Sequence, residues 1–266
     1  MIRVIKLSSP ATRQFWEIPI LFEDEHFLAL DKPSLLPTSP IREEPERPSL
    51  ISLLHHDLRR GASWAKERGL GYLINTHRLD AETSGVLLLA KSKPDLIALA
   101  NLFGSAAVQM RFIALVQGAP REDMIAVEAK LAPHPSIAGR MRVDEQRGKR
   151  SRTEFEARER FNGYTLIECR PFTHRLHQIR LHLSHVGFPI AGDTAYGGMP
   201  LLLSQLKPEY RLKPKKTERP LLSHPTLHVE ELSFRHPLTG MEVKAAAPWP
   251  KDLLVAVKYL RRYAAL

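Results

Sequence analysis

The sequence predicts an α+β fold with a mixed, mostly antiparallel central sheet and flanking helices. Short strand-like runs recur along the chain, and the helix-like segments among them do not follow the strand–helix–strand rhythm of a parallel sheet. The 266 residues contain no internal repeat and no clear linker. We therefore expect one large domain over residues 20–266, preceded by a short N-terminal lead-in over residues 1–19.

Runs of apolar and β-branched residues, bounded by turn residues, predict the strands of this sheet. Pro33 ends one of them, because proline cannot continue the hydrogen bonding of a central strand. Residues 237–240 supply the turn of a closing hairpin. The predicted strands span residues 2–6, 20–22, 27–30, 72–75, 85–91, 112–117, 125–131, 153–158, 164–170, 226–234 and 241–246.

Apolar residues spaced three and four apart predict the flanking helices. Pro94 suits the first turn of the second helix, and Gly187 ends the third. The proline-rich residues 34–48 and the basic residues 207–219 are predicted to be loops. The predicted helices span residues 48–59, 94–104, 174–186 and 253–260.

The chain is strongly basic, with a formal net charge of +10. Such a surplus favours a polyanionic partner such as nucleic acid, because Lys and Arg side chains release the counterions of phosphates. A role in solubility alone is the alternative. The charge therefore indicates RNA or DNA as a partner without identifying either.

Cys169 is the single cysteine, which excludes an internal disulfide and a zinc site built from cysteines. It falls in a predicted strand, so we expect a buried side chain rather than a catalytic thiol. The N-terminus lacks the apolar run of a signal peptide, and no window approaches the roughly 18 apolar residues of a membrane span. We expect a reducing compartment, a cytoplasmic location and no membrane association.

Residues 77–91, His-Arg-Leu-Asp-Ala-Glu-Thr-Ser-Gly-Val-Leu-Leu-Leu-Ala-Lys, place a charged loop directly before an apolar strand. Function often resides where a loop meets a rigid element. Arg78 lies two residues before Asp80, and a cationic partner favours the ionised form of an aspartate. An ionised carboxylate can act as a nucleophile or accept a proton. Judged by position alone, Asp80 would be a turn former or a surface charge.

A second polar segment, Thr-His-Arg-Leu-His-Gln-Ile-Arg-Leu-His-Leu, covers residues 173–183, and Gly-Phe-Pro-Ile-Ala-Gly-Asp-Thr-Ala-Tyr-Gly covers residues 187–197. Arg180 offers a buried carboxylate both charge and a fixed fork of donors. A solvated helix charge is the alternative. His177, His182 and His185 invite a metal interpretation, but the carboxylates that often complete a zinc site are not evident. We favour core or surface histidines.

Both segments resemble the motifs of the RluA-like pseudouridine synthase family. The first matches the family's active-site run through His-Arg-Leu-Asp, Thr-Ser-Gly and the apolar strand ending in Ala-Lys. The second keeps most of Gly-Arg-Thr-His-Gln-Ile-Arg, with His174 and Leu176 where glycine and threonine are usual. Residues 110–118 are similar to Lys-x-Tyr-x-Ala-x-Val-x-Gly, with Phe112 in place of the tyrosine. The likeness covers about residues 20–252 and implies the pseudouridine synthase catalytic fold.

The resemblance implies an enzyme that isomerises a specific uridine of RNA to pseudouridine, without a cofactor or a metal. By resemblance Asp80 is the catalytic aspartate, Arg78 occupies the place vacated by the everted base, and Arg180 pairs with Asp80. Phe112 would stack on the target base, with Ile179 as a second apolar wall; an ordinary core role for Phe112 is the alternative. The segment Lys32-Pro33 also has a family counterpart, to which we assign a structural role and no chemistry.

Two basic segments are candidates for contacts with the RNA phosphate backbone, which orient RNA without reading its sequence. Mobile solvated loops are the alternative. We expect tRNA or rRNA as the partner of a monomer. Because few residues precede the region of resemblance, we expect no S4-like RNA-binding domain and favour tRNA over large ribosomal RNA. The candidate backbone contacts are Arg140, Arg142, Arg150, Lys213, Lys215 and Lys216.

Two other functions fit parts of the sequence. The replacement of the usual tyrosine by Phe112 favours a non-catalytic RNA-binding protein on the same scaffold, whereas the retained Asp80, Arg78 and Arg180 oppose it. A glycoside hydrolase would need a second carboxylate across the sugar from Asp80, and no motif supplies one. An RNA pseudouridine synthase is therefore the favoured function.

Overall fold

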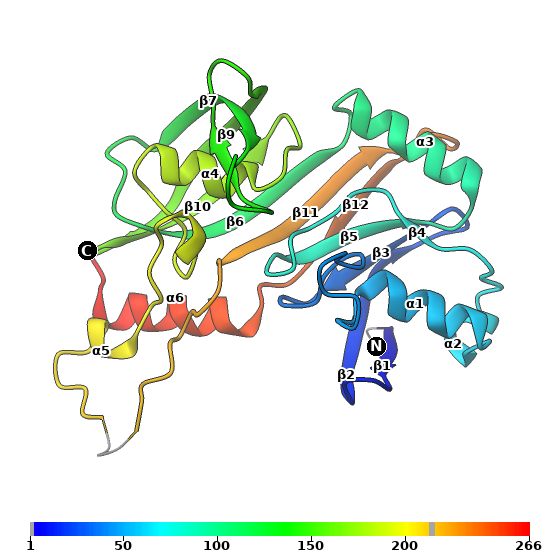
Figure 1. Cartoon of the computed structure of the whole chain (residues 1–266), viewed down its shortest axis with the longest axis horizontal. Coiled ribbons are helices and arrows are strands. Elements are labelled where there is room, and N and C mark those ends of the chain that lie inside the picture. Colours follow the sequence, from blue (N-terminus) through cyan, green and yellow to red (C-terminus); the bar gives the residue numbers. More distant parts are fainter. Residues whose placement is uncertain (1–2, 213–215) are drawn as a thin grey trace. The chain divides into compact units, whose positions relative to one another are not determined.

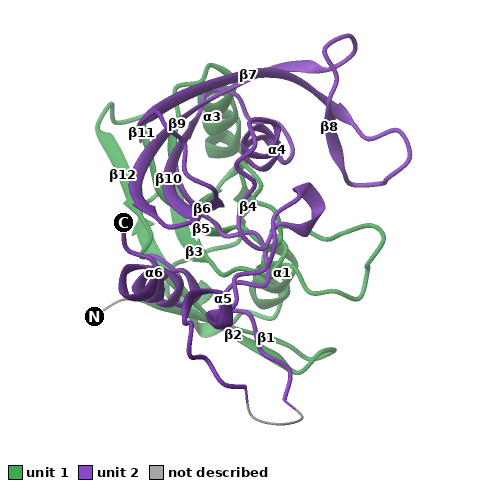
Figure 2. Ribbon diagram, turned by 90° about the vertical axis from the view of Figure 1, so that its left-hand side faces the viewer, with its two compact units in different colours: residues 1–110, 229–248 green, residues 111–228, 249–266 purple. Residues whose placement is uncertain are grey.

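The chain folds into two compact units, each built from two stretches of sequence. The computed structural model describes residues 3–212 and 216–266. Unit 1 consists of Met1–Met110 and Val229–Pro248, and unit 2 of Arg111–His228 and Trp249–Leu266. Figure 2 colours the two units separately. The sheet strands are mostly antiparallel and carry helices, so the predicted α+β class is confirmed.

Unit 1 contains a sheet in the order β1-β2-β3-β5-β11, with β12 paired to β11 and β4 paired to β5. Its described registers are antiparallel. Strand β2 runs through residue 19, so the division into a lead-in and a domain at that position stays a prediction. The strands are β1 (Val4–Ser9), β2 (Gln14–Glu23), β3 (Phe27–Lys32), β4 (Ile74–Asn75), β5 (Ser84–Ala90), β11 (Leu227–Arg235) and β12 (Glu242–Ala246).

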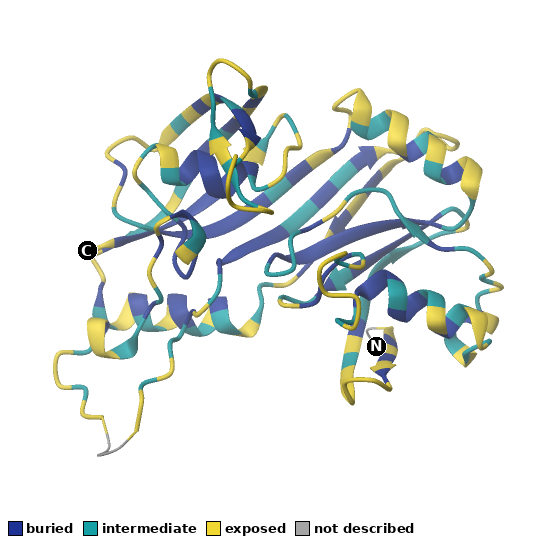
Figure 3. Cartoon of the chain, in the orientation of Figure 1, coloured by how far each residue is buried: buried dark blue, intermediate teal, exposed yellow. Residues whose placement is uncertain are grey.

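Strands β3 and β5 form the core of unit 1, and every residue of β5 is buried (Figure 3). Their near-continuous apolar sequences suit strands that are covered on both faces. Gly85 is required in β5, because a Cβ atom there would lie 2.1 Å from the carbonyl oxygen of Val229. Helix α3 (Lys93–Gly104) packs against β5 and helix α1 (Leu50–Arg59) against β1, while α2 (Ser63–Lys66) follows α1 (Figure 1).

The start of α1 is fixed by side-chain and backbone caps. Ser49 and Ser52 form a capping box, in which each side chain bonds the other residue's backbone N–H. The first two helical N–H groups, those of Leu50 and Ile51, donate to the carbonyl oxygens of Pro37 and Thr38 at 2.8 and 3.0 Å. The predicted loop 34–48 is thereby tied to the helix that follows it.

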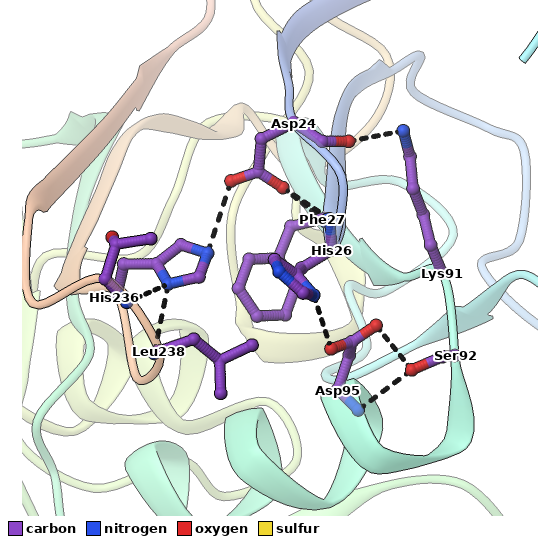
Figure 4. Close-up of polar contacts among 9 residues, drawn as sticks. Asp24, His26, Phe27, Lys91, Ser92, Asp95, His236 and Leu238 are labelled. Carbon is purple, nitrogen blue, oxygen red and sulfur yellow. Dashed lines mark hydrogen bonds and ion pairs between the residues drawn. The ribbon is translucent and has the colours of Figure 1, made fainter.

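A cluster of polar side chains surrounds the turn before β3 in unit 1 (Figure 4). Asp24 accepts hydrogen bonds from the backbone N–H groups of His26 and Phe27, and the His26 ring lies 2.9 Å from Asp95 at the start of α3. His236, in the β11–β12 turn, places Nε2 3.3 Å from Asp24. Its Nδ1 accepts two backbone N–H groups, so a neutral ring carries its proton on Nε2.

The strands of unit 2 pair antiparallel in the order β6-β10-β9-β7-β8. Helix α6 (Lys251–Tyr263) buries one face on these strands, and its alternating buried and exposed residues are visible in Figure 3. The remaining elements are β6 (Gln109–Gln117), β7 (Met124–Pro133), β8 (Met141–Val143), β9 (Lys149–Phe161), β10 (Tyr164–Pro171), α4 (Gln178–His185), the 3-10 turn Thr194–Tyr196 and α5 (Leu203–Leu206).

The predicted helix over residues 174–186 begins too early. Helix α4 starts at Gln178, because His177 adopts a left-handed conformation with φ of 53° that cannot continue a helix. The Gln178 side-chain oxygen accepts hydrogen bonds from the Thr173 hydroxyl and the Arg175 N–H. Residues 173–177 are therefore a loop held by the first residue of the helix.

Within the described ranges, every helix is too short or too polar to traverse a lipid bilayer.

Candidate active site

Asp80 lies in the loop that leads into β5. The Thr83 N–H donates to the Asp80 carbonyl oxygen at 3.1 Å, which closes a turn around the aspartate. Leu79 is buried, Asp80 is half-buried and Arg78 is exposed. The loop thus anchors itself through Leu79 and presents Asp80 at the edge of a rigid, buried strand.

Lys32, the last residue of β3, is fully buried beneath this loop. Its Nζ donates to the carbonyl oxygens of Pro33 at 2.8 Å, Leu36 at 2.7 Å and Ala81 at 3.1 Å. Three carbonyl acceptors match the three donors of an ammonium group. Ala81 directly follows Asp80, so this lysine holds the backbone of the aspartate loop.

Burial lowers the pKa of Lys32 from 10.5 to about 7, although the negative charges of Asp80 and Glu82 act in the opposite direction. Lys32 and Asp80 therefore interact electrostatically inside unit 1, and the negative charge of Asp80 favours the protonated form of the lysine. Sequence reasoning gave this lysine no part in the chemistry. A lysine at the end of a mostly apolar strand was the available signal, since lysine is rarely fully buried without partners.

The two ends of the segment 77–91 have structural roles. His77 accepts a hydrogen bond from the Leu88 N–H at 3.1 Å, and its ring stacks on Phe103 of α3 with centroids 5.1 Å apart. Lys91 binds Glu23 at 3.0 Å. It also donates to the Asp24 carbonyl oxygen at 2.5 Å (Figure 4). These contacts fix both ends of the segment that contains Asp80.

Arg180, on helix α4 of unit 2, forms an ion pair with Asp193. Its Nε and Nη2 donate to the two carboxylate oxygens at 2.7 and 2.8 Å, and both side chains are at most 7% exposed. The guanidinium carbon also lies 5.1 Å from the centre of the Tyr196 ring. Sequence reasoning did not assign Asp193 this role. Asp80 and Arg180 belong to different units, and their pairing stays a prediction.

The turn that carries Asp193 depends on Gly192. This glycine has φ of 82°, and a Cβ atom there would lie 2.2 Å from the His224 carbonyl oxygen. A side chain at this position would therefore displace Asp193 from Arg180. The Gly-Asp pair in residues 187–197 was the sequence signal for this partner.

Helix α4 is fastened to β9 by a hydrogen-bond network around His182. Ser151 donates to the Ala129 carbonyl oxygen, so it accepts from His182 Nε2 at 2.8 Å. The Thr153 hydroxyl accepts from Gln178 and donates to His182 Nδ1 at 3.0 Å. Burial lowers the pKa of His182 to about 4, which matches the neutral ring that this network requires.

The predicted apolar walls are both buried in unit 2. Phe112 lies on β6 opposite Cys169 of β10 and is 7% exposed, and Ile179 is 5% exposed. Cys169 is fully buried, as predicted, and burial raises the pKa of its thiol. The burial of Phe112 is compatible with a core residue and with the wall of a pocket, so its stacking role stays a prediction.

The candidate backbone contacts differ in how free their side chains are. Arg140 donates to the Ala195 carbonyl oxygen and lies over the Tyr196 ring, and Arg142 binds Asp144 at 2.5 Å. Arg150 and Lys216 are exposed. Lys213 and Lys215 lie outside the described residues.

No three His, Cys, Asp or Glu side chains of the described residues are grouped so that they could hold a metal ion. Of the three histidines considered, His182 is buried in the network above, and the His177 ring Nδ1 lies 2.8 Å from the Tyr196 hydroxyl. Both have protein partners.

Two solved structures share the fold of this chain. The protein titled Human RNA Pseudouridylate Synthase Domain Containing 4 aligns with a TM-score of 0.66 and 22% identity, over 91% of this chain and 92% of its own. Human RNA Pseudouridylate Synthase Domain Containing 1 aligns with a TM-score of 0.60 and 20% identity, over 92% and 94%. The fold is that of the pseudouridine synthase class.

Sequence relationships identify the family. Residues 26–185 match the family described as RNA pseudouridylate synthase. Ribosomal large subunit pseudouridine synthase D of Xanthomonas campestris is 33% identical over 97% of this chain and 74% of its own length. Ribosomal large subunit pseudouridine synthase C of Salmonella typhi is 34% identical over 91% and 70%. The chain belongs to the RNA pseudouridylate synthase family, and the resemblance to RluA-like enzymes is confirmed.

The protein is accordingly an RNA pseudouridine synthase, which is an isomerase. Membership of this family supports a catalytic role and not the alternative of a non-catalytic RNA-binding protein.

Proposed function

We propose that this synthase isomerises a uridine of large-subunit ribosomal RNA, with Asp80 as the reactive carboxylate. Relatives from Xanthomonas, Xylella and Salmonella are named for the large ribosomal subunit, and they match 91–98% of this chain. They favour ribosomal RNA in place of the tRNA favoured by sequence alone. We further propose that the enzyme acts as a monomer in the cytoplasm, where its ribosomal substrate is made.

The single observation that carries the proposal is that the buried Lys32 side chain binds the backbone of the Asp80 loop. Lys32 and the start of β5 hold the backbone that directly follows the half-buried aspartate, and the Lys32 amine interacts electrostatically with it. A carboxylate in a fixed place can attack an electrophilic carbon or take a proton without reorganisation.

The reaction exchanges one glycosyl bond for another. The bond between ribose C1′ and uracil N1 breaks, the base turns, and C1′ bonds to C5; the proton lost from C5 is balanced by one gained at N1. The overall change is an isomerisation with no oxidation. Asp80 can serve by attack on C1′, by addition to C6 or by removal of the 2′ proton.

The target uridine must leave its stack to reach a carboxylate, as enzymes that act on bases require. The exposed Arg78, two residues from Asp80, has a planar head suited to the vacated place. Phe112 and Ile179 would bound the pocket for the everted uracil, and Arg180 would pair with Asp80. RNA shape and splayed bases would then select the target.

Tritium release from RNA labelled at uridine C5 tests the proposed role of Asp80. Asp80→Asn should abolish release while RNA binding persists. Asp123→Asn is the control, because Asp123 directly precedes β7 and its side chain is 80% exposed. This variant should release tritium as the wild type does. Release by Asp80→Asn at the wild-type rate would refute the assignment.

The RNA target is tested separately by mapping pseudouridines in a strain that lacks this protein. The expected result is the loss of one or more sites from large-subunit ribosomal RNA, restored by the wild-type chain but not by Asp80→Asn. Loss confined to tRNA would overturn the ribosomal assignment and leave the catalytic assignment intact.

A further inference from the structure

The Thr38 hydroxyl is the second support of the Asp80 loop. Thr38 lies in the loop after β3 and is 2% exposed. Its hydroxyl donates to the Leu79 carbonyl oxygen at 2.8 Å and accepts from the Leu79 N–H at 3.1 Å. A single side-chain atom thus satisfies both polar backbone groups of one buried residue.

Leu79 is the one residue between Arg78 and Asp80. Its N–H belongs to the peptide group shared with Arg78, and its carbonyl belongs to the peptide group shared with Asp80. Because peptide groups are planar, the two hydrogen bonds fix the orientation of both planes. Thr38 therefore fixes the backbone direction on both sides of Leu79, toward Arg78 and toward Asp80.

Thr38 is itself held rigidly. Its carbonyl oxygen accepts the Ile51 N–H of helix α1 at 3.0 Å, and the preceding Pro37 carbonyl accepts the Leu50 N–H. Lys32 donates to the Leu36 carbonyl oxygen at 2.7 Å. The start of α1 and the end of β3 thus fix the segment that carries Thr38.

We propose that Thr38 is a positioning residue, whose hydroxyl sets the geometry of Arg78 and Asp80 for base eversion and catalysis. The proposal rests on the function proposed for Asp80. A hydroxyl is needed, because it alone among side chains of this size both donates and accepts through one atom. Valine has the same shape as threonine and does neither, whereas serine does both.

The test compares kcat and KM for tritium release by Thr38→Val and Thr38→Ser. Thr38→Val should lower kcat at least tenfold with KM for RNA changed less than threefold, because small displacements of reacting groups are costly in rate. Thr38→Ser should stay within threefold of the wild type in kcat. A thermal melt of each variant reports whether the chain is folded.

Thr165→Val is the matched control. The Thr165 hydroxyl is also buried and donates to a backbone carbonyl, that of Gly118 at 2.9 Å, but it lies in β10 of unit 2. This variant should keep kcat within twofold of the wild type. If Thr38→Val does not fold, Thr38→Ala takes its place, since it removes the hydroxyl without adding a buried methyl against the loop.

Failure of this inference is distinguishable from failure of the proposed function. Wild-type kcat in Thr38→Val, with Asp80→Asn inactive, would overturn the positioning role and leave Asp80 as the reactive carboxylate. Equal losses of kcat in Thr38→Val and Thr38→Ser would also overturn it, since the hydroxyl would then be irrelevant. Full activity of Asp80→Asn would refute both the catalytic role of Asp80 and the positioning role of Thr38.

Discussion

Arg180 and Asp193 form a buried ion pair with two hydrogen bonds, of 2.7 and 2.8 Å. The guanidinium that the family resemblance assigns to Asp80 is thus already oriented within unit 2. A planar fork that is held through two of its nitrogens has only its remaining donors to offer to another group. Asp193 therefore decides where Arg180 points.

Replacing Asp193 by Asn should destabilise the chain and slow the reaction. A buried guanidinium that loses its counter-charge costs about 3 kcal/mol or more. We expect that loss in chemical denaturation, together with a kcat reduced more than tenfold. Glu159→Gln is the control, because its pair with Arg261 is partly exposed and should contribute under about 1 kcal/mol. Equal effects of the two substitutions would contradict this assignment.

Asp31 gives the stability a dependence on pH that Asp31→Asn should remove. Burial raises the pKa of Asp31 from 3.8 to about 6, with Lys32 acting in the opposite direction. Between these two values the native chain holds a proton that the unfolded chain releases. The stabilisation from the protonated form is thus complete below pH 3.8 and is lost as the pH rises through about 6.

Asp31→Asn should therefore raise the free energy of unfolding at pH 7 by up to about 3 kcal/mol and change it little at pH 3.5. Urea denaturation of both chains at the two pH values measures the difference. A stability difference that is the same at both pH values would show that the Asp31 carboxyl does not titrate with a raised pKa.

Phe112→Leu distinguishes a stacking platform from a core residue. Leucine fills the buried site with an apolar side chain but offers no π face. If Phe112 stacks on the everted uracil, kcat/KM should fall roughly tenfold, since stacking contributes about 1–3 kcal/mol per base. Phe112→Tyr keeps the ring and is the control for that loss. Wild-type kcat/KM in Phe112→Leu would assign the residue to the core alone.

Arg150→Gln and Lys216→Gln should each weaken RNA binding uniformly across RNA sequences. A side chain that neutralises one phosphate reduces the slope of log affinity against log salt by about one when it is removed. Binding measured over a salt series gives this slope. Lys6→Gln is the control, because Lys6 is exposed on β1 and pairs with Glu17. A slope unchanged in the two test variants would mean that these residues do not contact phosphates.

Local sequence predicted most strands well because apolar runs and alternation reflect burial directly. The position of Arg180 on a helix followed from the same spacing of apolar residues. The start of α4 was wrong because His177 enters a left-handed conformation, which is unusual for a residue other than glycine. Leu35, with φ of 67°, is a second such residue that sequence rules would not place in a left-handed turn.

The contacts that hold the site residues were harder to predict from the sequence. From sequence, Lys32 was assigned a structural role and no chemistry. Its full burial depends on three carbonyl oxygens, the farthest from a residue 49 positions away, and local sequence does not reveal such partners. Thr38 and Leu79 are 41 positions apart, and Arg180 and Asp193 meet only because a glycine turn brings them together. Contacts of this range arise from the tertiary fold, which spacing rules within a window cannot express.

The discontinuity of unit 1 orders its assembly during synthesis. Strand β5, which follows directly on Asp80, has Val229 packed against Gly85, and Val229–Pro248 emerges from the ribosome only after all of Arg111–His228. Domains usually fold as they are made, from the N-terminus onward. Here the nascent chain must carry an unfinished N-terminal sheet until residues 229–248 are translated, so premature termination before residue 229 leaves β5 without its neighbour β11.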